Sequence, residues 1–311
     1  MKEPRGKELV ARYVKNYGIA ADTEISEQMV LAHWQLEKAL TKELLNSAPE
    51  NRWETFERCY DTLYRELPWL NKLPSGGTAV PHSERFRDWR AIIGNPPMKI
   101  YEVGSGKGEM IVYLASSGFE CKGTEITRQR GKKFVATQQN LRWAATDGVH
   151  LDKFEPINCY DVVISNQVIE HLHPDDLCEH FKSCVRILKS EGRYILCTPH
   201  RYAGPHDVSR VFKCDEPKGM HLKEYRYCEL VGLLSDAGFR EISAVFKMPT
   251  KLRTVSGLDF KPRVSRPYLR YLCFLDGLIS HLPTQALKRI ISSSLKAFFF
   301  STNMFLVATK V

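Results

Sequence analysis

The sequence predicts an α/β protein in which helices cover both faces of a mostly parallel sheet. Two observations lead to this prediction. From about Met98 to Phe246, short apolar segments typical of buried strands alternate with segments that have helical spacing. The first of these strands runs into a glycine-rich turn at residues 104–108 and then into a helix. A strand, a glycine loop and a helix in this order open many α/β folds that bind nucleotides.

Composition narrows the class of protein further. With 311 residues, the chain fits one large domain or a core with an accessory part. The nine cysteines are an odd number and form no CxxC pair, so we expect reduced thiols in a cytoplasmic protein and no cysteine zinc site. We find no signal peptide and no run of about 18 apolar residues, and predict no membrane span. The net charge of +9 allows an anionic partner.

Residues 1–90 are expected to form an N-terminal helical cap. Three segments with helical spacing, 7–18, 26–47 and 50–67, show no strand alternation, and the third carries Trp53, Phe56, Tyr60 and Tyr64. Residues 68–81 contain prolines and adjacent glycines, which indicates a linker. The cap could close over an active site as a lid, or it could simply pack against the core.

Residues 91–311 are expected to form the core. The expected strands cover residues 100–103, 120–127, 141–148, 158–166, 193–199, 239–248 and 301–311, and the expected helices cover 109–118, 128–140, 174–192 and 223–238. Residues 247–270 are basic, and two helical segments, 268–282 and 284–299, follow them. We therefore expect a basic and helical insertion at about 248–299, just before the last strand.

The spacing of the glycine loop argues against a dinucleotide. A dinucleotide-binding loop has the pattern GxGxxG, whose third glycine lets the helix pack closely on the strand. Here Gly104 and Gly106 are followed by Gly108, and Glu109 stands at the position of the third glycine. The pattern is GxGxG, preceded by an acidic residue, Glu102, and an apolar one.

The segments YEVGSGKGE, GTEI, DG, YDVVISNQVIEHL and GRYILCTP resemble the successive motifs of the class I S-adenosylmethionine-dependent methyltransferases, over roughly Lys99 to Phe246. The resemblance implies a Rossmann-like, mostly parallel seven-stranded sheet with helices on both faces, here with an N-terminal helical cap and a helical insertion before the last strand. In this family the last strand is antiparallel, and the insertion would separate it from its hairpin partner. The resemblance also implies S-adenosyl-L-methionine as the cofactor and methyl transfer as the reaction.

The resemblance places the cofactor site at the ends of the first four strands. Glu125 would accept hydrogen bonds from both ribose hydroxyls, and Asp147 one from the adenine amino group. Glu102 would support the loop and the amino-acid part of the cofactor. Asn166 falls at the carboxyl edge of the sheet, where open α/β sheets bind ligands. The expected cofactor-binding residues are Glu102, Gly104, Ser105, Gly106, Gly108, Glu125, Ile126, Asp147, Gly148 and Asn166.

Two groups of magnesium-dependent O-methyltransferases have an E-x-x-E-H run after the fourth strand: the enzymes of quinone biosynthesis and those that methylate the 3′ end of small RNAs. Glu170, His171 and, in HLKEY, His221 match three of their ligands, so they are candidates to bind Mg²⁺ or another divalent metal. Gln167 replaces the fourth ligand, a glutamate, which should weaken cation binding. Alternatively, His171 and His221 act as catalytic histidines without metal, or they have a structural role.

The loop between the fifth strand and His221 contains further candidates. His200, His206 and Asp207 could bind the methyl acceptor. His173 precedes Pro174 and is expected to start a helix rather than to bind a ligand.

The leading functional hypothesis is O-methylation of a hydroxyl on a small molecule, such as a sugar, a glycan precursor or a secondary metabolite. Methyl transfer from a sulfonium is an in-line displacement that depends mainly on proximity, but a hydroxyl must also lose its proton. RNA 2′-O-methylation is the alternative, and nucleic acid is the less favoured partner. A third hypothesis is a non-catalytic protein that binds the cofactor or a membrane surface. The sequence leaves open the oligomeric state and whether oxygen, nitrogen or carbon is methylated.

Overall fold

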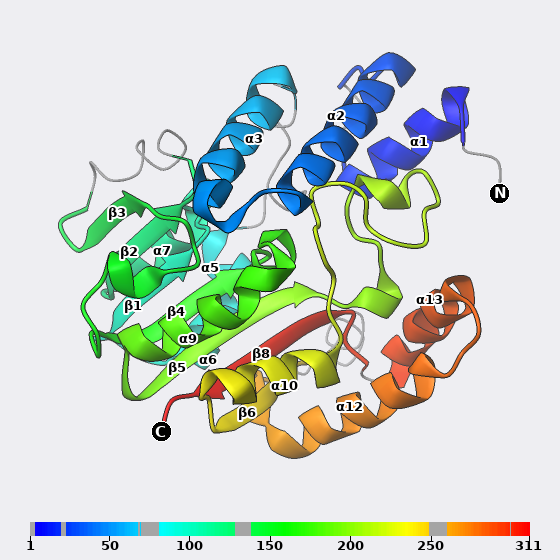
Figure 1. The fold of residues 1–311 in the computed structure, drawn as a ribbon. Helices are drawn as coiled ribbons and strands as arrows, with labels where there is room; N and C mark the ends of the chain where they lie inside the picture. The colour runs from blue at the N-terminus through cyan, green and yellow to red at the C-terminus, as the bar shows by residue number, and fades with distance from the viewer. Residues whose placement is uncertain are drawn as a thin grey trace.

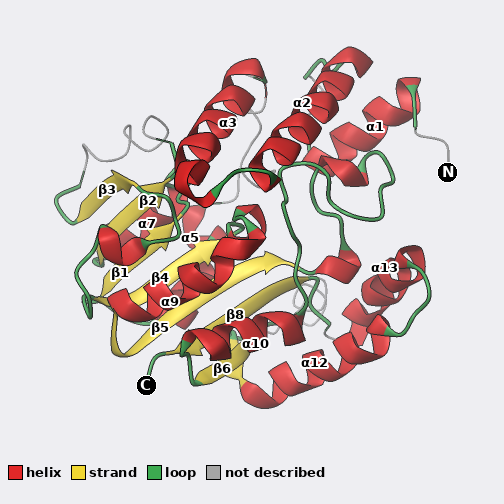
Figure 2. Cartoon of the chain, viewed as in Figure 1, coloured by secondary structure: helices red, strands yellow, loops and turns green. Residues whose placement is uncertain are grey.

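The structure, a computed structural model, describes residues 4–19, 23–67, 69, 81–127, 138–248, 260–298 and 300–311. An eight-stranded sheet runs through its centre in the order β3-β2-β1-β4-β5-β8-β6-β7, with helices on both faces (Figures 1 and 2). The expected α/β class is therefore confirmed. The expected helix at 128–140 falls mostly outside the described residues.

Five strands form the parallel part of the sheet, as the sequence predicts. They are β1 (Lys99–Val103), β2 (Glu120–Glu125), β3 (Leu141–Ala145), β4 (Tyr160–Asn166) and β5 (Leu188–Pro199). The last strand, β8 (Asn303–Thr309), lies antiparallel between β5 and β6 (Glu241–Phe246). The split hairpin implied by the resemblance is thus present. The sheet has one strand more than the seven expected, because the short β7 (Arg263–Ser265) pairs with the edge of β6.

The helices α7 (Glu109–Ser116), α9 (Leu177–Ile187) and α10 (Tyr227–Ala237) follow the expected pattern. The helix expected at 174–192, however, ends five residues early. Leu188 is fully buried and pairs with Tyr160, so β5 begins where helix was expected. Gly192 does not end the helix. It lies within β5, where an added Cβ would stand 2.8 Å from the carbonyl oxygen of Lys189.

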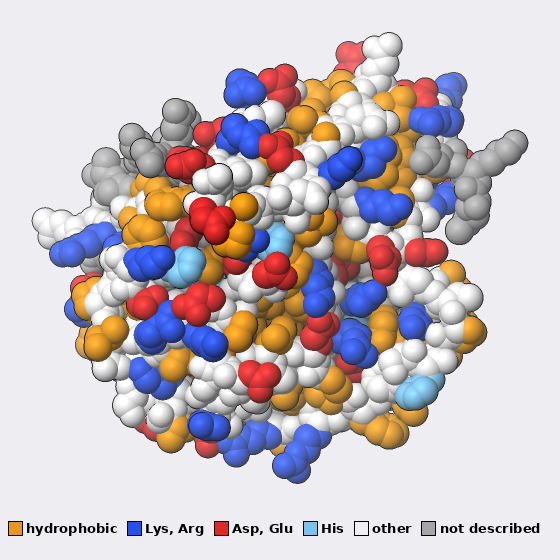
Figure 3. Space-filling model, viewed as in Figure 1, with side chains coloured by type: hydrophobic (Ala, Val, Ile, Leu, Met, Phe, Trp, Pro, Cys, Tyr) orange, Lys and Arg blue, Asp and Glu red, His pale blue; other side chains and the backbone are white. Residues whose placement is uncertain are grey.

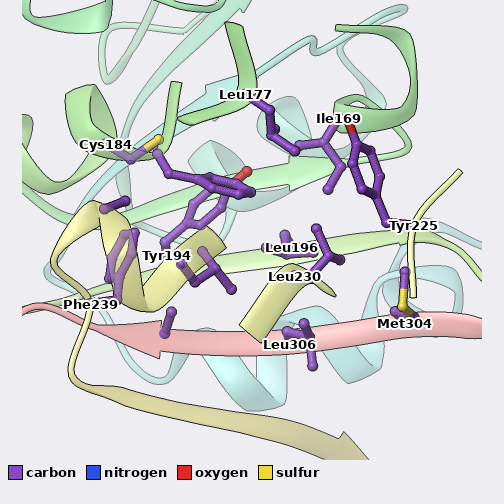
Figure 4. Packing of buried hydrophobic residues seen from close by; sticks show 14 of the residues in the cluster. Ile169, Leu177, Cys184, Tyr194, Leu196, Tyr225, Leu230, Phe239, Met304 and Leu306 are labelled. Carbon is purple, nitrogen blue, oxygen red and sulfur yellow. The ribbon is translucent and has the colours of Figure 1, made fainter. Parts of the chain in front are cut away.

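The core has two halves, one on each face of the sheet. On one face α9, α10 and α12 (Arg266–Ser280) pack on β5 and β8, and Figure 4 shows Leu196 and Leu306 of these strands beside Leu230 of α10. On the other face lie α5 (His82–Arg85), α6 (Arg87–Ile93) and α7. The sequence did not reveal α5 or α6. Both are short, and they follow the stretch interpreted as a linker.

The N-terminal helices stand together on one side of the molecule (Figure 1). They are α1 (Gly6–Tyr17), α2 (Glu27–Leu45) and α3 (Arg52–Glu66). Ser26 caps α2, because its hydroxyl accepts a hydrogen bond from the backbone of Met29. The apolar faces of these helices pack partly on residues 208–222, the loop that follows β5.

The late insertion contains α12 and α13 (Gln285–Ser294), on the opposite side of the molecule from α3 (Figure 1). A fully buried pair ties α12 to the core: the Nε2 atom of His200 lies 3.1 Å from the Oδ1 atom of Asp276. Burial lowers the pKa of His200, and its Nδ1 atom accepts from the backbone of Tyr202, so the proton lies on Nε2 and is donated to Asp276. None of the described helices is both long and apolar enough to cross a membrane.

We expect Asp276→Ala to destabilise the fold by about 3 kcal/mol, because it leaves a buried imidazole N–H and the backbone N–H of Cys228 without an acceptor. Asp276→Asn keeps an acceptor oxygen and should cost clearly less. Chemical unfolding curves of the two variants measure the difference. Equal and small losses in both variants would contradict the anchoring role of this pair.

Candidate active site

The glycine loop turns back toward β2 as soon as β1 ends. The backbone N–H of Ser105 donates to the carbonyl of Thr124 at 2.7 Å. Gly104 has a φ of +66°, and an added Cβ would lie 2.7 Å from the side chain of Val168, so only glycine fits there. At Gly106 an added Cβ would meet nothing within 4 Å. The loop therefore leaves open space beside Gly106.

Glu125, at the end of β2, faces the same loop. Its Oε2 atom accepts from the backbone N–H of Gly106 at 2.8 Å, and its Oε1 atom accepts from that of Ile126 at 3.0 Å. A carboxylate oxygen can accept two hydrogen bonds, so each oxygen can still accept one more. The backbone thus orients this carboxylate so that it can accept hydrogen bonds from two hydroxyl groups.

A cavity of about 390 Å³ opens between the glycine loop, the ends of β1, β2 and β4, and helix α3. Among the residues that line it are Glu102, Gly104, Ser105, Gly106, Glu125, Ile126, Asp147, Gly148 and Asn166. These are all the expected cofactor-binding residues except Gly108. That glycine instead stands at the start of α7, as its N-cap, with a φ of +73°.

Glu102 and Ser105 bring unsatisfied polar atoms to this cavity. The Oε2 atom of Glu102 and the hydroxyl of Ser105 are buried and have no hydrogen-bond partner among the described residues. Burial raises the pKa of Glu102 to about 7, although the nearby Ser105 hydroxyl offsets part of the effect. Buried polar atoms without partners are costly, so a polar ligand in the cavity would satisfy both.

The loop after β3 is held from two sides. The Oδ1 atom of Asp147 accepts from the backbone N–H groups of Val149 and His150, both at 2.9 Å. The carbonyl of Gly148 accepts from the Nδ1 atom of His180 at 2.6 Å. Burial lowers the pKa of His180 to about 4, so this imidazole is neutral at pH 7 and donates through Nδ1. These contacts fix the part of the loop that faces the cavity.

Helix α3 supplies an aromatic wall that faces the strand ends. Phe56, Tyr60 and Tyr64 recur every four residues, which places them on one face of the helix, and all three line the cavity. The sequence showed these aromatic residues but not their role. Arg85 and Phe86 also line the cavity. Neither belongs to a recognised motif, so the sequence did not reveal them.

Glu170, His171 and His221 come together beside this cavity. Their ligand atoms all lie within 4.8 Å of one another, although Glu170 and His221 are 51 positions apart in the chain. Of the three, only His171 lines the cavity. The imidazole rings of His171 and His221 meet edge to face, with centroids 4.8 Å apart.

Each member of this cluster is oriented by a neighbour. The hydroxyl of Thr198 donates to the Oε2 atom of Glu170 at 2.8 Å, and the buried Oε1 atom of Glu170 has no partner in the part of the chain that the structure describes. The Nδ1 atom of His171 lies 2.9 Å from the carbonyl of Met220. A carbonyl only accepts, so Nδ1 carries the proton, and Nε2 is the atom able to accept a proton or bind a metal. The third pair joins His221 Nδ1 to Glu224 Oε1 at 2.8 Å.

The cluster is rich in acidic groups. Burial raises the pKa of Glu170 to about 7. Burial alone would lower the pKa of His221, but its hydrogen bond to Glu224 and the charges of Glu170 and Asp207 outweigh this effect and raise it to about 9. The pocket therefore favours a positive charge, which a proton on His221 supplies in the absence of a metal.

The remaining candidates have other contacts. His206 and Asp207 bond to Glu224 and to the backbone of Gly219, and so support the cluster from behind. His200 points into the interior toward Asp276 and cannot contact a ligand in the cavity. His173 accepts from the backbone N–H of Asp175 at a helix start, as expected.

Gln167 stands at the position of the fourth ligand. It lines the cavity, but its amide nitrogen is directed to the carbonyl of Cys197, at 3.5 Å. Its backbone adopts a φ of +58°, which is uncommon for a residue with a side chain.

The cavity fits S-adenosylmethionine in its chemistry. Glu125 can accept two hydroxyl groups, Glu102 and Ser105 offer unsatisfied polar atoms, and the space beside Gly106 is open. The cluster fits a divalent cation less closely. Bonds of about 2.1 Å would require ligand atoms no more than about 4.2 Å apart, so the side chains would have to draw together slightly.

We expect the Glu102→Gln substitution to change how stability depends on pH. In the folded protein Glu102 takes up a proton at about pH 7, whereas the ordinary value is 4.5, so its contribution to stability falls as the pH rises between these two values. The gap corresponds to about 3 kcal/mol.

Relative to the wild type, Glu102→Gln should therefore gain about 3 kcal/mol of stability between about pH 5 and about pH 8, measured by denaturant unfolding without cofactor. Glu120→Gln, at the other end of β2, is the control, since the side chain of Glu120 is 60 % exposed. A gain that does not depend on pH would refute the explanation.

We expect Glu125→Ala to weaken the binding of S-adenosylhomocysteine at least ~30-fold, because two hydrogen bonds to a charged acceptor are lost. Gly106→Val should also weaken it, since the new side chain would fill the open space beside the loop. Isothermal titration measures both, with Glu120→Ala as control and circular dichroism as a check of folding. Unchanged binding in both variants would show that the cofactor binds elsewhere.

Comparison with known proteins agrees with this geometry. A model of the methyltransferase domain family matches residues 82–244, more than half of the chain. No curated protein matches this chain. Among solved structures, an S-adenosylmethionine-dependent methyltransferase from Archaeoglobus fulgidus is 17 % identical, with a TM-score of 0.51 over 78 % of this chain and 99 % of that one.

Phosphoethanolamine N-methyltransferase 2 from Haemonchus contortus, solved with S-adenosylhomocysteine, is 14 % identical, with a TM-score of 0.50 over 85 % of this chain and 60 % of that one. At these identities the two structures share the fold with this chain. The family match and the motifs that line the cavity together show that the chain belongs to the methyltransferase domain family and is an S-adenosylmethionine-dependent methyltransferase.

Proposed function

We propose that this methyltransferase acts on a hydroxyl group of a small molecule, and that the cluster of Glu170, His171 and His221 activates this hydroxyl. The observation that carries the proposal is the position of His171. It lines the cofactor cavity with its imidazole, while Glu170 and His221 stand beside it. A hydroxyl oxygen is a weak nucleophile until its proton is taken up, and this cluster offers groups suited to that task.

Support for a small acceptor comes from the aromatic wall of α3, which faces the strand ends in the same cavity as His171. The cavity of about 390 Å³ has the size of a small-molecule site, and the cofactor would lie in it. We propose that residues 1–90 act as the cap over this site, with Tyr60 next to the acceptor, since its ring lies 6.3 Å from that of His171.

The proposed reaction is a single displacement of the methyl group from sulfur to oxygen. Held by the glycine loop and Glu125, the cofactor would supply a methyl group on a sulfonium centre, and its sulfur would leave as a neutral thioether as the acceptor oxygen takes the methyl group. The Nε2 atom of His171 takes the hydroxyl proton, because Met220 fixes the proton of the other ring nitrogen on Nδ1. The cap and the glycine loop hold the reacting groups in line and exclude water.

A divalent cation is a second way to activate the hydroxyl. Glu170, His171 and His221 would hold it. The Oε1 atom of Glu170, which has no partner among the described residues, and the fixed Nδ1 protons of both histidines are suited to this role. A cation there would lower the pKa of a hydroxyl and would replace the proton on His221.

We expect His171→Gln to lower methyl transfer at least ~100-fold while S-adenosylhomocysteine binds as before, because the acceptor of the proton is lost and the cofactor contacts remain. His173→Gln, which removes a histidine two positions away, should leave the activity largely intact. The assay follows labelled methyl transfer over a panel of hydroxyl compounds, and nuclear magnetic resonance identifies the methylated atom. Products methylated on nitrogen would disprove the hydroxyl proposal.

Chelation separates the two forms of the proposal. If EDTA abolishes activity and added Mg²⁺ or Mn²⁺ restores it, the cation form holds, and titration of the metal alone should show weaker binding to Glu170→Gln. If activity survives EDTA and added metal has no effect, His171 acts as the base by itself.

A further inference from the structure

Helix α12 carries an apolar stripe that the core does not cover. Tyr271, Phe274 and Leu278 are spaced three and four residues apart, which places them on one face of the helix, and they are 38 %, 63 % and 55 % exposed. The opposite face is buried and packs in the core through Leu269, Leu272, Leu275 and Ile279. Packing against the core therefore explains the buried face but not the stripe.

Exposed apolar side chains are concentrated around this helix. Nine large hydrophobic side chains are exposed in the part of the chain that the structure describes, and six of them lie between residues 260 and 290. The six are Phe260, Val264, Tyr271, Phe274, Leu278 and Ile290. Single exposed apolar residues are ordinary, but a concentration of them marks an interaction surface.

Positive charge predominates around the stripe, although the exposed Glu241 of β6 pairs with Arg266 at the start of α12. From residue 261 to the last residue, 311, the sequence contains a single acidic residue, Asp276, which is fully buried against His200. The basic residues in the same stretch are Lys261, Arg263, Arg266, Arg270, Lys288, Arg289, Lys296 and Lys310. The first four of these are exposed at the start of α12, and Figure 3 shows Lys and Arg side chains along the lower edge of the molecule, where α12 lies in Figure 1.

We propose that α12 and the turn before it form a docking surface for an anionic lipid membrane. The helix would lie in the plane of the interface, with Phe274 and Leu278 among the upper parts of the acyl chains and Arg270 against lipid phosphates. A helix with an apolar face of aromatic and aliphatic residues, flanked by basic ones, has the composition of such interfacial helices. Positive charge beside the apolar stripe complements an anionic leaflet.

The chemistry of the stripe favours lipid over nucleic acid. Basic residues alone would serve either partner, and aromatic rings can stack on bases. Aliphatic side chains such as Val264, Leu278 and Ile290 gain nothing from a base or a phosphate, but they gain free energy when they leave water for a lipid phase.

The proposed docking surface lies away from the cofactor cavity. In Figure 1, α12 lies at the bottom of the molecule and α3, which lines the cofactor cavity, lies at the top. Substitutions in the stripe should therefore change the partition to a membrane and leave cofactor binding intact.

The test measures co-sedimentation of the full chain with vesicles of one part phosphatidylglycerol to three parts phosphatidylcholine, and with vesicles of phosphatidylcholine alone. We expect binding to the anionic vesicles that weakens as salt is raised, and little binding to the neutral ones. The double variant Phe274→Ser with Leu278→Ser should bind at least ~10-fold more weakly. Arg270→Glu should also bind ~10-fold more weakly, because one attractive charge becomes repulsive.

Two matched controls test whether any exposed apolar side chain, or any change of net charge, would have the same effect on vesicle binding. Ile157→Ser removes an apolar side chain that is 66 % exposed elsewhere, and Lys15→Glu makes the same charge change on the exposed side of α1. Both should bind vesicles like the wild type. Unchanged binding of S-adenosylhomocysteine confirms that each variant is folded.

Three results would overturn the proposal. One is no binding of the wild type to anionic vesicles at low salt. Another is an equal loss in the controls and in the stripe variants. The third is evidence for a different occupant. If the wild type forms a dimer and the double variant is a monomer, the stripe binds a second copy of the chain. If the wild type binds single-stranded RNA but not vesicles, the surface binds nucleic acid.

Discussion

A short backbone segment, residues 219–223, joins the N-terminal helices to the reactive cluster. On one side it bonds to α2: the hydroxyl of Thr41 donates to the carbonyl of Gly219, and the carboxylate of Glu37 accepts from the N–H of Met220. On the other side the carbonyl of Met220 accepts from His171, and the N–H groups of residues 222 and 223 donate to the carbonyl of Glu170. The protonation of His171 and the position of the cap thus depend on the same few peptide groups.

This arrangement explains how the N-terminal helices come to stand beside the strand ends, where α3 lines the cavity. The apolar faces of α1, α2 and α3 pack on Val208, Phe212, Met220 and Leu222 of the loop after β5 rather than directly on the strands. Loop and cap therefore share two small cores, and each positions the other. As a result, α3 faces the strand ends with its aromatic side chains, and the site is built from segments far apart in the sequence.

The cavity divides into two parts with different physical origins. The part expected to hold the cofactor is formed by backbone: a glycine loop, strand ends and turns, with Glu125 oriented by two peptide N–H groups. The part that we propose faces the acceptor consists of side chains from the cap, the turn after β4 and the segment near His221. The family match at residues 82–244 covers the glycine loop and the strand ends but not α3, so it identifies the cofactor and not the acceptor.

The sequence by itself determined the order of strands and helices, the glycine loop and the residues at the strand ends, because these follow from local periodicity and from the rule that parallel strands end at one edge. Only the tertiary structure decided the rest. The bond from Glu37 to Met220 spans 183 positions, the edge strand β7 exists because β6 offers it a partner, and Arg85 reaches the cavity because α5 packs beside the loop. Such contacts depend on how buried faces meet across the whole chain, and no local pattern of residues records that.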